Sequence, residues 1–158
     1  MAITEKLGIP HWLDPADARI AAWMERHCQL LMRISLAAIF LWFGMLKPLG
    51  MSPEGELIRR TVYWVPPDAF IPLLGWWEMA IGAGLLYRPL IRGALFLLML
   101  QLPGTMLPLI LLPEVCFTRI PFGLTLEGQY IIKNLFLVGA AFVIGSKVRH
   151  QKARDNEP

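Results

Sequence analysis

Four long stretches of the chain carry almost only apolar side chains, and polar segments separate them. They cover residues 34–51, 69–87, 93–113 and 128–146. A run of about 20 apolar residues, rising about 1.5 Å per residue in a helix, crosses the roughly 30 Å hydrocarbon layer of a bilayer. The pattern therefore predicts an all-α membrane protein, a bundle of four transmembrane helices.

The third stretch is unusual because three prolines interrupt it. Residues 93–113 contain no charge, only Gln101 and Thr105 as polar side chains, and Pro103, Pro108 and Pro113. Each proline removes a backbone donor and leaves a carbonyl about four residues earlier without its helical partner. Such groups are tolerated in a membrane where protein or a water-filled cavity surrounds them. We therefore expect a broken helix next to a functional cavity.

The segments outside the four stretches divide the chain into three regions. Residues 1–32 form an N-terminal segment, residues 33–146 the bundle, and residues 147–158 a polar tail expected to lack regular structure. Asp14 and Pro15 are typical of a helix start. An apolar stripe follows and predicts an amphipathic helix that lies on the cytoplasmic membrane surface before the chain turns into the first span: Ile20, Trp23, Met24, His27 and Leu31.

The connections also carry predictions. Ser52 and Pro53 are expected to start a short helix whose apolar face, from Leu57 to Val65, lies opposite charged residues. Residues 88–92 predict a tight turn, and the apolar loop 114–127 is expected to fold over the mouth of the bundle. Small residues at four-residue spacing predict close helix packing at two pairs: Ala80 with Gly84, and Ala141 with Gly145.

Composition agrees with a membrane protein, and the distribution of charge gives its orientation. The chain is 56% hydrophobic, with a mean hydropathy of +0.51. With both termini cytoplasmic, ten basic residues lie on the inner side and four on the outer: Lys6, Arg19, Arg26, Arg33, Arg88, Arg92, Lys147, Arg149, Lys152 and Arg154 against Lys47, Arg59, Arg60 and Arg119. The net charge of +3 is dispersed around apolar spans, which excludes a nucleic-acid-binding surface.

A few polar residues fall within or beside the spans, and these are the candidate ligand-binding residues. Charged groups at bilayer depth cost about 2.5–3.5 kcal/mol each on insertion scales, so they mark pairs, pathways or sites. We expect an outward-opening polar pocket built by Lys47, Glu78, Gln101, Glu127, Lys133 and Asn134. The alternatives are a structural ion pair between Glu78 and Lys133, and lysines that extend to the interface without forming a site.

Other chemistry is poorly represented. Cys28 and Cys116 fall on opposite sides of the bilayer and cannot form a disulfide; we interpret them as buried or interfacial thiols, with Cys116 as a redox thiol the alternative. His11, His27 and His150 are scattered and suggest no metal cluster. Motifs for phosphate loops, covalent haem and paired CxxC thiols are missing. Redox work would thus require a partner's centre or a diffusible carrier such as a quinone.

Four segments in order resemble those of one known family. They are Arg33 with Phe43-Gly44-Met45-Leu46-Lys47, Trp76-Trp77-Glu78 with Ile81-Gly82-Ala83-Gly84-Leu85, Gln101-Leu102-Pro103-Gly104-Thr105-Met106-Leu107-Pro108-Leu109, and Leu126-Glu127-Gly128-Gln129-Tyr130-Ile131-Ile132-Lys133-Asn134. Together they resemble the DoxX/DoxD-like family of four-helix integral membrane proteins. The resemblance implies a bacterial inner-membrane protein that works with oxidoreductases, since DoxD members belong to a thiosulfate:quinone oxidoreductase. The long N-terminal segment and the third proline depart from the family pattern.

The expected function is therefore a membrane subunit that binds a quinone or another small redox-active molecule and works with a protein partner. One alternative is a transporter of a small solute, passive or proton-coupled, although no inverted repeat is visible. Another is a non-catalytic assembly or scaffold subunit. The sequence leaves open the ligand, the partner, whether the chain forms a homo-oligomer and whether it is catalytic at all.

Overall fold

The structure is all-α apart from one small hairpin, which confirms the predicted fold class. The computed structural model describes residues 14–154, and the surroundings of side chains for residues 16–146. The elements in chain order are α1 (Asp14–Leu46), α2 (Gly55–Thr61), α3 (Pro67–Leu86), the 3₁₀ turn η2 (Arg88–Leu90), α4 (Ile91–Met106), α5 (Pro108–Leu111), α6 (Pro113–Cys116), β1 (Phe117–Arg119), β2 (Gly123–Leu124) and α7 (Leu126–Arg154).

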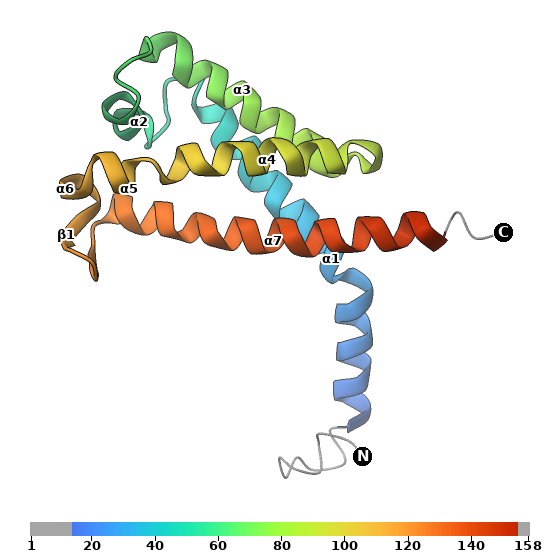
Figure 1. Cartoon of the computed structure of the whole chain (residues 1–158). Helices are drawn as coiled ribbons and strands as arrows, with labels where there is room; N and C mark the ends of the chain where they lie inside the picture. Colours follow the sequence, from blue (N-terminus) through green and yellow to red (C-terminus); the bar gives the residue numbers. More distant parts are fainter. Residues whose placement is uncertain (1–13, 155–158) are drawn as a thin grey trace.

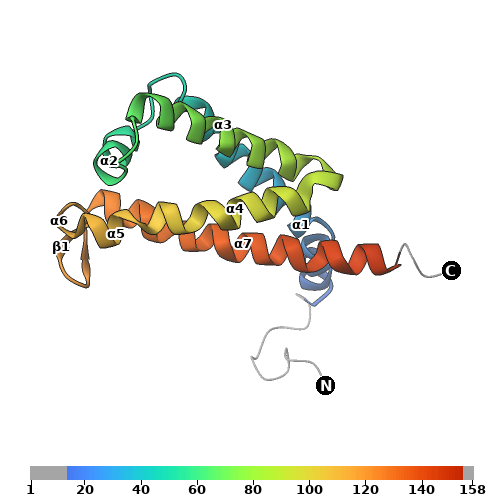
Figure 2. The same ribbon diagram turned by 45° about the horizontal axis from the view of Figure 1, so that its top comes forward.

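Four long helices form the body of the molecule, and each packs against the next. α1 packs along α3, α3 against α4, and α4 against α7, while α7 returns to contact α1 (Figure 1). The end of the bundle that carries α2, α5, α6 and the hairpin is called the α2 end below. The opposite end, where η2 joins α3 to α4, is called the turn end. The ribbons of α3 and α4 meet at the turn end and diverge toward the α2 end (Figure 2).

Four helical segments among the described residues are long and apolar enough to cross a membrane. They are Ala16–Leu46, Pro67–Leu86, Arg88–Leu111 and Leu126–Ser146, with mean hydropathies between 1.4 and 2.0. The three later segments match the predicted spans closely. Four such segments are those of a multi-pass membrane protein.

The expected N-terminal helix is the first part of α1, which runs without interruption from Asp14 to Leu46. The described side chains of this part, up to residue 26, are exposed, and the ribbon changes direction before it joins the bundle (Figures 1 and 2). At the other end the expected tail without regular structure is wrong for residues 147–154, because α7 continues to Arg154. In both places no proline or glycine stops the helix.

An apolar core fills the half of the bundle toward the turn end. All four long helices contribute to it: Leu36, Ala37, Phe40, Ile81, Leu85, Ile91, Ala94, Leu98, Ala140, Ala141 and Ile144. Arg33 closes this half, because its guanidinium donates hydrogen bonds of 3.1 and 2.8 Å to the carbonyl of Leu85 and one of 3.2 Å to that of Leu86. The last carbonyls of a helix lack helical donors, so Arg33 caps α3.

Glycines allow α1 and α3 to approach closely along their contact. A Cβ on Gly75 would lie 2.5 Å from the carbonyl oxygen of Gly44, and a Cβ on Gly82 would lie 2.8 Å from Leu41. These positions differ from the predicted close contact at Ala80, which is exposed. The prediction for Gly84 is confirmed, since a Cβ there would lie 2.9 Å from Ala94 of α4.

The connecting segments at the α2 end agree with their patterns in part. α2 begins after the Ser52-Pro53 turn, with its apolar side chains half-buried or buried and Arg59 and Arg60 exposed, as predicted. The apolar loop instead forms the hairpin β1–β2, whose tip is open: Ile120 is 72% and Phe122 93% exposed. The expectation that this loop covers the bundle is therefore wrong for its tip.

Candidate functional site

The site begins with Lys47, the residue that follows α1. Pro48 has no backbone N–H and disfavours a helical conformation of the residue before it, so α1 ends here. The chain turns back through Gly50, which adopts a left-handed conformation with φ of 71°. The turn directs the side chain of Lys47 into the bundle, where only 1% of it is exposed.

The close approach of α1 and α3 brings Lys47 to Glu78. The Lys47 Nζ donates a hydrogen bond of 2.6 Å to Glu78 Oε2. Glu78 lies eleven residues after Pro67, or roughly 16 Å along α3. It is 7% exposed. Removing one partner of a buried ion pair costs about 3–5 kcal/mol, because the other charge is left uncompensated. Lys47 and Glu78 therefore depend on each other.

Two further side chains complete a connected polar network. Gln101 Nε2 donates a hydrogen bond of 2.8 Å to Glu78 Oε1, so both carboxylate oxygens of Glu78 have a donor. Lys47 Nζ also donates to Glu54 Oε2 over 3.2 Å. Glu54 lies just before α2 and its side chain is 45% exposed. The four residues Glu54, Lys47, Glu78 and Gln101 are called the polar network below.

Two buried polar atoms on α3 and α4 have no hydrogen-bond partner among the described residues. They are the indole Nε1 of Trp77, a donor, and the Oε1 of Gln101, an acceptor. Buried polar atoms are nearly always hydrogen-bonded, so an unsatisfied one asks for an explanation such as a ligand. Trp77 precedes Glu78 on α3, and Gln101 bonds to Glu78 from α4. The unused acceptor therefore lies on the side chain that bonds the buried carboxylate, whereas the unused donor lies on a side chain that packs against the apolar core.

The proline-broken segment follows Gln101 directly, as predicted. Pro103 lies inside α4, which ends at Met106, and the two short helices α5 and α6 each begin with a proline. Since Pro103 cannot donate, the carbonyl of Met99 lacks its helical partner. The irregular backbone therefore starts one turn from the polar network.

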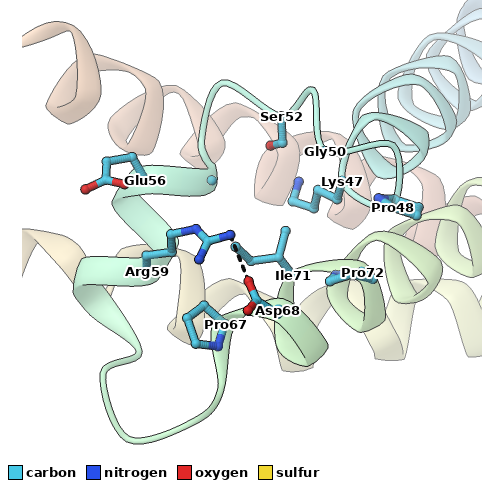
Figure 3. Close-up of a pocket in the computed structure, with 11 residues that line it drawn as sticks. Lys47, Pro48, Gly50, Ser52, Glu56, Arg59, Pro67, Asp68, Ile71 and Pro72 are labelled. Carbon is cyan, nitrogen blue, oxygen red and sulfur yellow. Dashed lines mark hydrogen bonds and ion pairs between the residues drawn. The ribbon is translucent and has the colours of Figure 1, made fainter.

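A polar cavity lies at the α2 end, on the other side of Lys47. Its volume is about 360 Å³, and it is lined by the turn after α1, by α2 and by the start of α3 (Figure 3). Arg59 reaches across it to Asp68, with 3.0 Å between Nη2 and Oδ1. The carboxylate of Glu56 points away from the cavity and binds Arg60 over 3.0 Å. Lys47 thus connects the cavity with the interior of the bundle.

The three predicted site residues on the last helix lie apart from this network. Glu127 and Lys133 are exposed, and Asn134 is half-buried. The ammonium of Lys133 lies 5.5 Å from the centre of the Tyr130 ring. The alternative pairing of Glu78 with Lys133 is not formed, since the partner of Glu78 is Lys47. Of the six predicted residues, the structure brings together Lys47, Glu78 and Gln101.

Sequence reasoning missed Glu54 and Trp77. Glu54 lies in a connection, outside the spans in which intramembrane charges were sought. The available signal was its position, seven residues after a lysine at a span end, in a connection short enough to return to that lysine. Trp77 is an apolar residue of the span by composition, and only its unsatisfied indole nitrogen distinguishes it.

The environment of Cys116 does not favour a reactive thiol. Cys28 and Cys116 are both free thiols. Cys116 is fully buried where α6 ends. Burial, with Glu127 and Glu114 nearby, raises the pKa of its thiol. A high pKa keeps the thiol protonated and unreactive, which favours the interpretation as a buried thiol. Among the residues that the structure describes, no group of His, Cys, Asp and Glu could hold a metal ion; His11 lies outside them.

Comparison of the chain with family models, curated proteins and solved structures found no match.

Proposed function

We propose that the protein is the membrane subunit of an oxidoreductase system and binds a quinone, or a small molecule with the same hydrogen-bonding groups, beside the polar network. The observation that carries the proposal is the pair of unsatisfied buried atoms, Trp77 Nε1 and Gln101 Oε1. Together they offer one donor and one acceptor. A quinone carbonyl accepts a hydrogen bond and a quinol hydroxyl can donate one, so this pair suits both redox forms.

The polar network supports the same proposal. Reduction of a quinone takes up two electrons and two protons, and its reversal releases them. Glu78 is a buried carboxylate that can hold a proton, and the Lys47 ammonium at 2.6 Å stabilises it when it is charged. Gln101 orients Glu78 by donating to its second oxygen. These residues would bind and orient the ligand and exchange a proton with it.

The electrons would come from or go to a protein partner. The described residues include no metal-binding group, and the resemblance to DoxX/DoxD-like proteins agrees with a redox partner. In our proposal the protein lies in a bacterial inner membrane with both termini cytoplasmic, because the basic residues are concentrated on that side. The α2 end and its cavity then face the outer side.

The test is quinone binding to the purified full-length protein in lipid nanodiscs, with a short-chain ubiquinone analogue as the probe. Gln101→Leu and Trp77→Phe each remove one hydrogen bond to the ligand and leave a partner group unsatisfied. Each should weaken binding about tenfold or more, since such a loss costs about 1–3 kcal/mol. Glu78→Gln should also weaken it.

The matched control is Lys133→Met, a change of an exposed residue in a candidate span away from the network. It should bind as the wild type does. The proposal would be abandoned if the wild type bound no quinone, or if all four variants bound equally well while remaining folded by circular dichroism.

A further inference from the structure

The polar network has one exposed end and one buried end. The side chain of Glu54 is 45% exposed, that of Lys47 is 1% exposed and that of Glu78 is 9% exposed. Hydrogen bonds of 3.2, 2.6 and 2.8 Å connect Glu54 to Lys47, Lys47 to Glu78 and Gln101 to Glu78. The chain of contacts therefore runs without a gap from water to the interior of a membrane-spanning bundle.

We propose that Glu54, Lys47 and Glu78 form a proton path between the water at the α2 end and the buried site. Its use for a quinone depends on the function proposed above, whereas proton exchange by Glu78 does not. Each of the three side chains can both gain and release a proton. Glu54 is the entry residue of the path, a role that no span pattern in the sequence indicates.

The transfer is balanced at every atom. When Glu78 carries a proton received at the site, the Lys47 ammonium passes one of its protons to the Glu54 carboxylate. The neutral amine of Lys47 then takes the proton from Glu78, which becomes a carboxylate again. Glu54 releases its proton to water, and all three groups return to their starting charges.

The surroundings allow this path at one end of the bundle only. Lys47 after α1 and Gln101 on α4 bond to Glu78, and Glu54 before α2 bonds to Lys47. The cavity of about 360 Å³ borders Lys47 at the α2 end, and the half-exposed Glu54 side chain reaches water at that end. Toward the turn end, the apolar core from all four long helices separates Glu78 from water. Protons should therefore reach Glu78 from the α2 end.

The network also explains why a charged residue precedes α2 in this place. Glu54 makes no side-chain cap on α2. Its carboxylate is used by Lys47 instead. By contrast Glu56, two residues later, pairs with Arg60 one turn along the same helix. Glu56 is thus a carboxylate of the same segment outside the path, and it supplies a matched control.

The experiment is a rapid drop in pH applied to the full-length protein in nanodiscs, without quinone. Protonation of Glu78 is followed by the infrared band of its neutral carboxyl group, assigned as the band that Glu78→Gln abolishes. Glu54→Gln should slow the appearance of this band about tenfold or more, because positioned acid–base groups speed proton transfer by about 10²–10⁴-fold. Glu54→Asp keeps a titratable group and should restore most of the rate.

In Glu56→Gln, Glu78 should become protonated at the wild-type rate. Equal rates in Glu54→Gln and Glu56→Gln would overturn the path, and so would the failure of Glu78 to protonate at any pH at which the protein stays folded. Because no quinone is present, neither result depends on the outcome of the quinone-binding test. If the wild type bound no quinone while Glu54→Gln still slowed the protonation of Glu78, the proposed function would be overturned and the proton path would stand.

Discussion

The ion pair of Lys47 and Glu78 gives the most direct prediction about stability. In Lys47→Met, Glu78 stays in its place with 7% exposure and keeps only the hydrogen bond from Gln101. It loses the ammonium at 2.6 Å. Leaving a buried charge without its partner costs about 3–5 kcal/mol. The contact with the half-exposed Glu54 adds little, about 0–1 kcal/mol.

Lys47→Met should therefore lower the free energy of unfolding by about 3–5 kcal/mol, between about two and four orders of magnitude in the unfolding equilibrium. Adding Glu78→Gln removes the uncompensated charge. The double variant should recover at least about 2 kcal/mol, because contacting residues show coupling energies of about 0.5–3 kcal/mol. Equilibrium unfolding by SDS in mixed micelles, followed by circular dichroism, measures both quantities.

Lys133→Met is the control, since it removes an exposed lysine that forms no ion pair among the described residues and lies over the Tyr130 ring. Such an exposed contact contributes about 0.5–1 kcal/mol. An effect of Lys47→Met no larger than that of Lys133→Met would contradict the energetic role of the buried ion pair. Simple addition of the effects of Lys47→Met and Glu78→Gln would contradict it as well.

Two further predictions concern the packing of a glycine and the titration of a buried thiol. Gly75→Ala places a Cβ 2.5 Å from a carbonyl oxygen of α1 and should lower the free energy of unfolding by about 1–3 kcal/mol. Gly139→Ala, where a Cβ meets nothing within 4 Å, should not destabilise the protein. Equal effects of the two variants in the same SDS assay would contradict the close approach of α1 and α3. The raised pKa of Cys116 means that the folded state holds the thiol proton more tightly than the unfolded state, so stability should fall as pH rises above the ordinary thiol value of 9.0. Cys116→Ala should remove that decline, and an unchanged decline would assign it to other groups.

Hydrophobic pattern and turn chemistry predicted most of the fold. The spans follow from apolar length, the short helix α2 from its alternating faces, and the break after Gln101 from the prolines. The length of α1 was not predictable in the same way. Its apolar stripe before Arg33 resembles that of a surface helix. The helix continues from this segment into the first span because no proline or glycine interrupts it there.

The site was only partly predictable from the sequence. The depth of a residue in the membrane can be counted along a span, but the side of the helix that faces the bundle cannot. Lys47 and Lys133 are both lysines near span ends, and the sequence cannot say which faces the bundle. Packing decides it: the glycines at 44 and 75 bring α1 against α3, which turns Lys47 inward. Lys133 lies on an exposed face of α7. Glu54 reaches the network through a turn, where no periodic pattern exists to show it.

Photolabelling with an azido-quinone in the native membrane would show whether a ligand binds between α3 and α4 beside Glu78. Mass spectrometry of the digested protein locates the attached label. We expect label on α3 around Trp77 and on α4 around Gln101, displaced by excess unlabelled quinone. Displaceable label confined to α7 around Lys133, or no displaceable label at all, would rule out this binding site.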